Sequence, residues 1–315
     1  MIKKGPKYFA KVLLFGEYGI IENSKALAIP YRQFKGGLKL PAGEMNEKQK
    51  ESNRHLRAFY EYLVEKSRQH PDLLDLELDE FRKDLDAGLY FDSDIPEGYG
   101  LGSSGAVVAA VYERYARNKI SVLENLTRDK LIRLREIFAL MESFFHGKSS
   151  GLDPLNSYLS VPILIHEADA IEPTGIPQGS REGKGAIFLI DTQVKGETAP
   201  LVQLFMEKLK DEGFRHVLKE QFIKYTNVCV NDFLHGDFKS LLGNVKQLSA
   251  TVYEHFRPMI PVHMLDIWKK GMQTGDYYLK LCGSGGGGYM LGFTEDFDKV
   301  KELLKDYRLQ VIYRF

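Results

Sequence analysis

A glycine-rich turn between a strand-like run and a helix-like run restricts what this chain can fold into. Leu89 to Phe91 is a short apolar run, residues 96–105 contain four glycines, and Val107 to Tyr115 has the apolar character of a buried helix. Such a turn directs backbone N–H groups and a helix N-terminus toward an anion. It is equally typical of a tight connection in which Ser103 or Ser104 caps the helix. The turn therefore predicts a phosphate site or a simple structural connection.

The same glycines fit a dinucleotide fingerprint. Gly100, Gly102 and Gly105 satisfy G-x-G-x-x-G, and Glu124 follows about 20 residues later as the ribose-binding carboxylate would. That fingerprint belongs to a compact βαβ unit, and Arg117 to Glu124 makes a poor second strand. A Walker A loop would need Gly-Lys-Ser/Thr, and this turn has no lysine. A nicotinamide site and a nucleotide phosphate cradle of another kind both remain open.

Length, charge and cysteine usage exclude several classes of protein. The 315 residues suffice for about two domains at roughly 150 residues each. The 43 basic and 43 acidic side chains give no net charge, so we expect neither nucleic acid nor a membrane surface as partner. No apolar run approaches the ~18 residues of a membrane span. Cys229 and Cys282 lack metal or disulfide spacing, which favours reduced thiols and a cytoplasmic location.

Apolar periodicity predicts a mixture of helices and strands. Between Glu47 and Gln69 apolar residues recur with helical spacing, whereas Leu74, Leu76 and Leu78 alternate with acids as in a half-buried strand. Further strands are expected at Tyr8–Phe15, Leu27–Pro30, Gly37–Leu40, Leu89–Phe91, Val161–Ile165, Ala186–Ile190, Tyr277–Leu281 and Tyr289–Phe293. Further helices are expected at Val107–Tyr115, at Thr127–Phe145 and between Pro200 and Phe256. The Pro- and Gly-rich stretch Glu172–Gly185 predicts a linker, so we expect domains at residues 1–179 and 180–315.

Three other segments combine residues that could carry chemistry. Lys11 opens a strand-like run that leads to Gly16 and Glu17, although a strand lysine is usually a solvated edge residue. His146 to Asp153 forms a turn before a short helix, which an N-cap-like serine and a surface carboxylate would also explain. Gly283 to Gly288 lies between two strand-like runs, where a binding loop, a structural turn and a flexible linker compete.

Together these segments resemble the GHMP kinase superfamily, and within it the mevalonate kinases. Lys11 to Glu17 fits K-x-x-L-x-G-E, Pro96 to Ser104 fits P-x-x-x-G-L-G-S-S, and Gly283 to Gly288 fits a terminal G-x-G-G-G-G loop. His146 to Asp153 also fits the mevalonate kinase pattern H-G-x-x-S-G-x-D. The resemblance implies an α+β, two-domain fold with the active site between the domains. It consists of an N-terminal α/β domain with a left-handed βαβ unit and a C-terminal ferredoxin-like α+β domain.

The resemblance also implies an enzyme that uses ATP and Mg²⁺ to phosphorylate a hydroxyl group of a small molecule. Asp153 would face the hydroxyl as general base or orienting group, with Lys11 beside it. Ser104 and Glu142 would bind Mg²⁺. The residues expected to bind ATP are Pro96, Gly98, Gly100, Leu101, Gly102, Ser103, Ser104 and Gly105. Those expected to contact the substrate are Glu17, Tyr18, His146, Thr198, Gly285 and Gly286. A homodimer is a further expectation from similar kinases.

Departures from the mevalonate kinase pattern leave the acceptor open. Tyr18 stands where mevalonate kinases usually carry histidine, as phosphomevalonate kinases commonly do, whereas Ser150 to Asp153 looks more like mevalonate kinase. Gly196 replaces an expected arginine shortly before Thr198. Gly105 stands where alanine is common, a change to which we attach little functional content.

The preferred function is therefore phosphorylation of mevalonate to 5-phosphomevalonate in isoprenoid synthesis. A phosphomevalonate kinase and a sugar kinase of the same superfamily are the nearest alternatives. An NAD-dependent dehydrogenase would leave Lys11, Asp153 and the last glycine loop without a role. A non-catalytic ligand sensor would have no need to keep Lys11, Ser104, Glu142 and Asp153 together.

Overall fold

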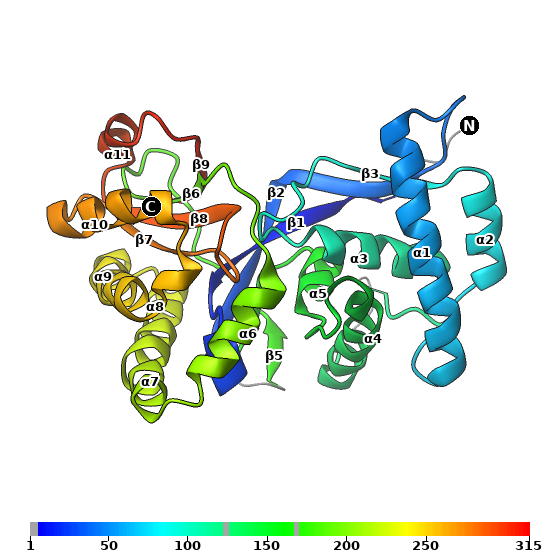
Figure 1. The fold of residues 1–315 in the computed structure, drawn as a ribbon, viewed down its shortest axis with the longest axis horizontal. Coiled ribbons are helices and arrows are strands. Elements are labelled where there is room, and N and C mark those ends of the chain that lie inside the picture. The colour runs from blue at the N-terminus through cyan, green and yellow to red at the C-terminus, as the bar shows by residue number, and fades with distance from the viewer. Residues whose placement is uncertain (1–5, 122–125, 167–169) are drawn as a thin grey trace. The chain divides into compact units, whose positions relative to one another are not determined.

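The computed structural model describes residues 6–121, 126–166 and 170–315, which form two compact units (Figure 1). The first unit comprises the residues up to Lys11 together with Ile29–Pro96 and Leu101–Val161. The second comprises Val12–Ala28, Glu97–Gly100 and Pro162–Phe315. Neither unit is one continuous stretch of chain, so the single domain boundary expected near Gly179 stays a prediction.

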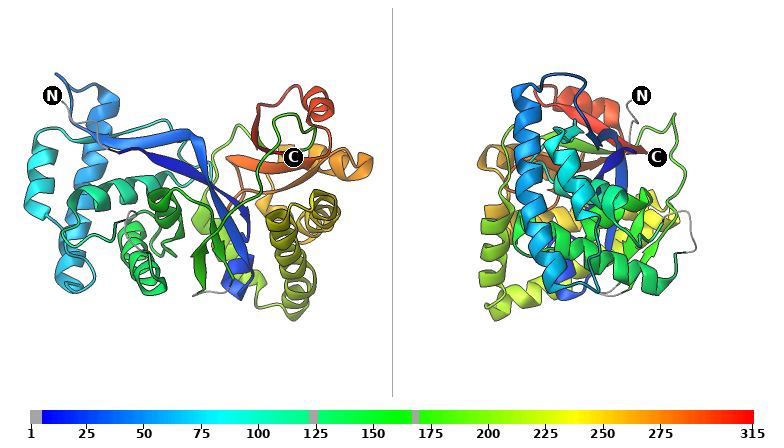
Figure 2. Two further views of the ribbon diagram at one scale, coloured as in Figure 1. Left: turned by 180° about the vertical axis from the view of Figure 1, so that it is seen from behind. Right: turned by 90° about the vertical axis from the view of Figure 1, so that its right-hand side faces the viewer.

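The first unit is built mainly of helices that pack beside long strands. Figure 2 shows α1, α3, α4 and α5 gathered side by side, and α1 packs on β3. Leu56, Phe59 and Leu63 form the buried face of α1, which confirms the helical spacing over Glu47–Gln69. The elements that lie wholly within this unit are α1 (Glu47–Gln69), α2 (Leu78–Asp86), β3 (Tyr90–Ser93), α3 (Ser103–Tyr115), α4 (Arg128–His146) and α5 (Leu152–Leu159).

Two strands contribute residues to both units. They are β1 (Tyr8–Phe15) and β2 (Ala26–Lys39), and they belong to a sheet of order β1-β2-β4-β5 in which β3 also pairs with β2. The two strands expected at Leu27–Pro30 and Gly37–Leu40 are therefore one strand. Its start pairs antiparallel with β4 and its end pairs antiparallel with β3. Pro30 falls between these two ladders, so its missing N–H group removes a bond from neither.

The strand expected over Leu74–Leu78 is wrong. Leu76 forms only an isolated bridge, and helix α2 begins at Leu78. Phe81 and Leu85 are both buried on that helix. The helical spacing from Leu78 to Leu85 therefore outweighs the two-residue alternation that precedes it.

The second unit contains a four-stranded antiparallel sheet of order β7-β8-β6-β9. Chain order is strand, helices, two strands, helix and strand, which is the ferredoxin-like arrangement that the resemblance implies. Helix α9 packs on β7 and β8, and α8 lies beside α9 (Figure 1). The sheet is formed by β6 (Ala186–Asp191), β7 (Tyr278–Leu281), β8 (Tyr289–Thr294) and β9 (Leu309–Arg314). The strands expected at Ala186–Ile190, Tyr277–Leu281 and Tyr289–Phe293 are thus confirmed.

The remaining elements of the second unit are short strands and helices. The strands are β4 (Ile163–Ile165) and β5 (Ile171–Pro173). The α-helices are α6 (Thr198–Lys208), α7 (Glu212–Val217), α8 (Lys224–His235), α9 (Phe238–His255), α10 (Leu265–Thr274) and α11 (Phe297–Leu303). Short helices of other types are η1 (Gly19–Glu22), η2 (Leu218–Ile223), η3 (Arg257–Met259) and η4 (Val262–Met264). The handedness of the N-terminal βαβ connection stays a prediction.

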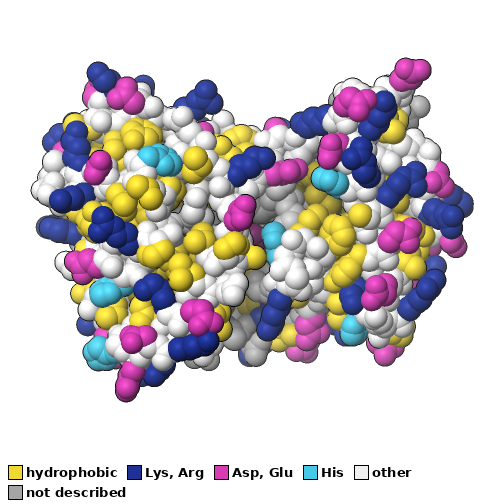
Figure 3. All heavy atoms as spheres, viewed as in Figure 1, with side chains coloured by type: hydrophobic (Ala, Val, Ile, Leu, Met, Phe, Trp, Pro, Cys, Tyr) yellow, Lys and Arg dark blue, Asp and Glu magenta, His cyan; other side chains and the backbone are white. Residues whose placement is uncertain are grey.

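Two observations concern the expectations about membranes and nucleic acid. None of the helices in the described part of the chain is both long and apolar enough to cross a bilayer. On the face displayed in Figure 3, basic and acidic side chains are interspersed rather than segregated.

Candidate active site

Lys11 and Asp153 form an ion pair in the first unit. Lys11 lies on β1, is 5% exposed, and its Nζ is 2.9 Å from Asp153 Oδ1. Asp153 stands in the first turn of α5, where the helix dipole favours a negative charge, and its side chain is 38% exposed. The interpretation of Lys11 as a solvated edge lysine is therefore wrong. A partly exposed carboxylate beside a buried cation can accept a proton or a hydrogen bond from a ligand hydroxyl group.

The start of α3 lies beside this ion pair. The N-cap residue of α3 is Gly102, with φ of 73°, and no side chain caps the helix. The interpretation of Ser103 or Ser104 as a capping serine is therefore wrong. A Cβ atom on Gly102 would lie 2.9 Å from Lys11 Cγ, so glycine allows the loop to pass over the lysine. The uncapped N–H groups of α3 suit an anion such as a phosphate group.

Ser104, Glu142 and His146 converge at the same end of α3. Ser104 Oγ donates to Glu142 Oε1 at 3.0 Å and lies 3.0 Å from His146 Nε2. Ser149 Oγ also donates to Glu142. Burial of Glu142, and next the negative charge of Asp153, raise the pKa of this carboxyl to about 7. Burial likewise lowers the pKa of His146.

The Ser104 and Glu142 oxygens fit a magnesium ion that is shared with phosphate. Mg²⁺ prefers oxygen ligands and is commonly held by one or two protein groups together with substrate phosphates and water. In residues 6–121, 126–166 and 170–315, no three His, Cys, Asp or Glu side chains form a cluster that could hold a metal alone. The sequence assigned His146 to the substrate, and the structure brings its ring to the candidate metal ligand Ser104.

We expect Ser104→Ala to raise the Mg²⁺ concentration needed for half-maximal turnover. The variant removes one of the two converging oxygens and leaves Glu142 in place. The measurement is a magnesium titration at saturating nucleotide. Ser143→Ala is the matched control, because the Ser143 hydroxyl bonds only back to the Ala139 carbonyl of its own helix among the described residues. An identical magnesium response in wild type and Ser104→Ala would remove Ser104 from the metal site.

We expect Glu142→Gln to stabilise the metal-free protein at pH 8 more than at pH 5. The folded-state pKa of Glu142 is raised, so its contribution to stability is present at low pH and is lost as pH rises through about 7. Glutamine stays neutral and avoids that loss. Thermal unfolding in EDTA at the two pH values measures the effect, and Glu136→Gln on the exposed face of α4 is the control. An equal shift at both pH values would contradict the raised pKa.

Gly105 has a packing role that the sequence interpretation missed. A Cβ atom at this position would lie 2.7 Å from the backbone carbon of Asp153 and from the nitrogen of Pro154. Glycine therefore allows α3 to approach the start of α5 closely. Because the contacts are to backbone atoms, a side chain could enter only by displacing Asp153.

We expect Gly105→Ala to destabilise the protein by about 1–3 kcal/mol, the usual cost of overpacking, and to lower kcat by displacing Asp153. Gly243→Ala in α9 is the control, since nothing lies within 4 Å of its added Cβ atom and alanine favours a helix. Urea unfolding and steady-state kinetics measure the two effects. A stability gain at both glycines would show that α3 and α5 are not closely packed.

Tyr18 and Thr198 meet the last glycine loop in the second unit. The Tyr18 hydroxyl donates to the Ser284 carbonyl at 2.7 Å, and Ser284 Oγ donates to Thr198 Oγ1 at 3.2 Å. The Tyr18 ring packs on Phe205 with a centroid distance of 4.7 Å, and its backbone has φ of 57°. Burial and the nearby Glu17 raise the pKa of Tyr18, so its phenol is a neutral donor. The sequence predicted Tyr18 and Thr198 for one site but did not single out Ser284, although it lies inside the glycine motif.

The glycine run Gly283 to Gly288 is a packed loop between β7 and β8, so the flexible-linker interpretation is wrong. A Cβ atom on Gly285 would lie 2.4 Å from the Met259 carbonyl oxygen, and one on Gly286 would lie 2.6 Å from Leu201 Cδ1. On the other side, a Cβ atom on Gly100 would lie 2.7 Å from the Cys282 carbonyl oxygen. Close approach of backbone atoms therefore requires glycine at positions 285 and 100, and a φ of 75° favours glycine at position 286.

Glu17 is almost fully buried and pairs with Lys280, a partner that the sequence did not reveal. Glu17 is 3% exposed and Lys280 is 0% exposed, and their charged atoms lie 2.8 Å apart. Burial raises the pKa of Glu17 and the lysine lowers it. Lys280 Nζ also donates to the Leu281 carbonyl at 2.8 Å. The expected contact of Glu17 with substrate stays a prediction.

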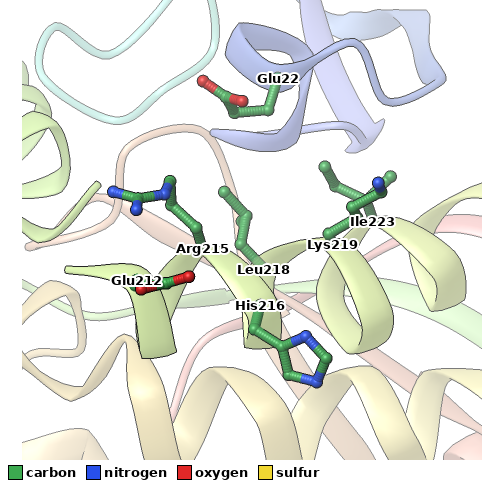
Figure 4. Close-up of a pocket in the computed structure, with 7 residues that line it drawn as sticks. All are labelled: Glu22, Glu212, Arg215, His216, Leu218, Lys219 and Ile223. Atoms are coloured by element: carbon green, nitrogen blue, oxygen red, sulfur yellow. The ribbon is translucent and has the colours of Figure 1, made fainter. Parts of the chain in front are cut away.

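A pocket elsewhere in the second unit is lined by none of the predicted site residues. Figure 4 shows Glu22 of η1 facing Arg215 and Leu218 across it, with His216 directed away. The Arg215 guanidinium donates to the carbonyls of Leu209 and Lys210, which lie between α6 and α7.

Comparison with known proteins shows similarity to one family of kinases. Residues 61–160 match the family model described as GHMP kinases N terminal domain. The chain is 24% identical to a mevalonate kinase of Pyrococcus abyssi over 320 residues, covering 89% of this chain and 85% of that protein. It superposes on L. major mevalonate kinase in complex with R-mevalonate with a TM-score of 0.66 at 16% identity, covering 99% and 97% of the two chains.

A second solved structure has the same fold. Streptococcus pneumoniae phosphomevalonate kinase in complex with phosphomevalonate and AMPPNP matches with a TM-score of 0.62 at 15% identity, covering 98% and 99% of the two chains. These findings confirm the resemblance to the GHMP kinase superfamily and its α+β fold. The pairs β2–β3, β2–β4, β4–β5, β6–β8, β6–β9 and β7–β8 are antiparallel, unlike the parallel pairs of a doubly wound nicotinamide-binding sheet. Glu124, on which that interpretation also depended, lies outside the described residues.

Proposed function

We propose that this chain is an ATP- and Mg²⁺-dependent kinase that phosphorylates a hydroxyl group of a small molecule. The observation that carries the proposal is the 2.9 Å contact of Lys11 with Asp153 beside the uncapped start of α3. A carboxylate that can accept a proton and a helix N-terminus that suits phosphate are the two parts that phosphoryl transfer requires. The match to the GHMP kinase N-terminal domain over residues 61–160, which include the start of α3 and Asp153, supports this assignment.

Each residue of the first-unit cluster has a distinct role in the proposed reaction. Asp153 accepts the hydroxyl proton or orients the hydroxyl group, and Lys11 stabilises the developing negative charge on its oxygen. The N–H groups at the start of α3 bind phosphate oxygens. Mg²⁺ held by Ser104 and Glu142 would neutralise negative charge on the phosphates.

Mevalonate is the acceptor that we favour. The curated relative and the L. major structure are both named as mevalonate kinases, and the latter holds R-mevalonate. Thr198 accepts a hydrogen bond from Ser284 in the last glycine loop, so two segments predicted to contact the substrate lie together. The missing arginine at position 196 has a steric cause, because a Cβ atom there would lie 2.8 Å from the Gly285 carbonyl oxygen.

Phosphomevalonate is the second candidate, and Tyr18 is the observation that favours it. The neutral Tyr18 phenol donates a hydrogen bond to the Ser284 carbonyl. By the resemblance, mevalonate kinases usually carry histidine at this position, whereas phosphomevalonate kinases commonly carry tyrosine. The S. pneumoniae phosphomevalonate kinase shares the fold over 98% of this chain.

The test is a coupled assay of ADP release with ATP and Mg²⁺. Mevalonate, phosphomevalonate and a panel of sugars and sugar phosphates are each supplied as acceptor. Turnover of mevalonate alone supports the proposal in full. Turnover of another acceptor retains the kinase and rejects mevalonate, whereas ATP binding without turnover of any acceptor would favour a ligand sensor.

A further inference from the structure

The segment that follows β6 joins two glycine loops of the second unit by hydrogen bonds. Gly196 N–H donates to the Gly98 carbonyl at 3.0 Å, which connects the segment to the turn predicted to bind phosphate. Gly288 N–H donates to the Val194 carbonyl at 2.6 Å, and Thr192 Oγ1 donates to the Gly288 carbonyl at 2.7 Å. Residues 192–198, which we call the bridging segment, are therefore held on both sides by glycine-rich backbone.

Only some positions of the bridging segment have room for a side chain near these loops. Position 196 has none, because an added Cβ atom would lie 2.8 Å from Gly285 O and 3.3 Å from Gly287 N. The preceding residue, Lys195, does have room. Its Cβ and Cγ atoms lie 3.4 and 3.6 Å from where a Cβ on Gly98 would stand, and its backbone carbonyl approaches Gly287. The stem of Lys195 thus runs along one glycine loop while its backbone abuts the other.

The charge of Lys195 is unmatched. Its side chain is exposed, and its ammonium forms no ion pair or hydrogen bond with any residue in the described ranges. Gly98 has φ of 77° and Gly100 has φ of 76°, left-handed conformations that glycine permits. A cation that has no partner among the described residues, and whose stem is held beside such a turn, is suited to bind an anion as a point charge.

We propose that Lys195 binds an anionic oxygen of the ligand held by the two glycine loops, and thereby contributes to specificity. The anionic oxygen belongs either to a nucleotide phosphate or to an acidic group of the acceptor. The inference rests on the proposed function, since it takes the turn at residues 96–105 to be a nucleotide site. Lys195 supplies binding energy and takes no part in proton transfer.

The test compares wild type with Lys195→Met and Lys195→Arg. Loss of one charge-assisted contact should raise one KM by about tenfold or more in Lys195→Met, whereas Lys195→Arg should retain most of the affinity. A raised KM for ATP assigns the contact to phosphate, and a raised KM for mevalonate or phosphomevalonate assigns it to the acceptor. The affected KM should also depend less on salt than in wild type. Lys239→Met, which removes an exposed lysine from α9, is the control.

Unchanged KM values for both substrates in Lys195→Met would overturn the inference. Its failure is distinguishable from failure of the proposed function, which would appear as a wild-type protein without turnover. In that case calorimetric titration of wild type and Lys195→Met with ATP and with mevalonate still decides the question. Equal affinities for both compounds would overturn the role of Lys195, and a weaker affinity for either would support it.

Discussion

Asp153→Asn should lower kcat by roughly 10² to 10⁴-fold, the range by which a positioned proton acceptor accelerates a reaction. This corresponds to about 3–5 kcal/mol in the barrier. Asparagine keeps the size of the side chain and loses the charge that pairs with Lys11 at 2.9 Å. Nucleotide affinity should stay within a few fold of wild type, because the N–H groups at the start of α3 do not depend on Asp153. Steady-state kinetics and a nucleotide titration measure the two quantities.

Asp266→Asn is the matched control for this variant. Asp266 also stands in the first turn of a helix, α10, and is exposed, so it loses the same favourable interaction with a helix dipole. We expect its kcat to be unchanged. Wild-type turnover in Asp153→Asn would exclude Asp153 from the mechanism. In Lys11→Met/Asp153→Asn the losses should be far from additive, because the two residues act as one unit.

Lys280→Met should destabilise the protein by about 3–5 kcal/mol, since it leaves the Glu17 carboxylate buried without its partner. That is a large part of the ~5–15 kcal/mol by which a folded domain is usually stable. Burial raises the pKa of Glu17, and loss of the lysine should raise this pKa further. The loss of unfolding free energy in Lys280→Met should therefore be smaller at pH 5 than at pH 8, because a neutral carboxyl group is easier to bury. Urea unfolding at the two pH values measures both effects.

Two further variants distinguish the effect of the unpaired buried charge from the general effect of losing an ion pair. Lys299→Met breaks the ion pair of the exposed Lys299 with the half-buried Asp276, and the carboxylate it leaves can still reach water, so stability should change far less. Glu17→Leu/Lys280→Met removes both charges and should recover much of the lost stability. If Lys280→Met does not fold, Glu17→Gln provides the measurement, since it also removes one partner and leaves the lysine in place. Equal stability of wild type and Lys280→Met would show that the pair contributes nothing.

Local signals predicted several elements correctly. The apolar spacing within Glu47–Gln69 predicted α1, because Leu56, Phe59 and Leu63 form the buried face of that helix. Strand β8, which follows the last glycine run, was also predicted, since it is buried along its whole length and is mostly apolar. The Leu74–Leu78 error arose where two periodicities overlap within a few residues, and only the packing of Phe81 and Leu85 decides between them.

The sequence predicted which residues form the candidate site better than it predicted the contacts between them. The resemblance to GHMP kinases indicated Lys11, Ser104, Glu142 and Asp153, and the structure brings all four into one cluster of the first unit. The sequence could not indicate that Lys280 pairs with Glu17, because a lysine in a strand carries no local sign of its partner. The tight approach of Gly105 to Asp153 was equally hidden, since it depends on the distance between two helices.

The division of the chain into two interleaved units has a consequence for how the protein is made on the ribosome. Residues 12–28 belong to the second unit, and Ala26–Ala28 pair with Ile163–Ile165. That part of β2 therefore emerges long before its partner strand is synthesised. The first unit can close once Val161 has left the ribosome, whereas the N-terminal contribution to the second unit must wait for the C-terminal half. Cutting the chain after Val161 would therefore keep the first unit in one fragment, whereas the second unit would lose residues 12–28 and 97–100 to that fragment.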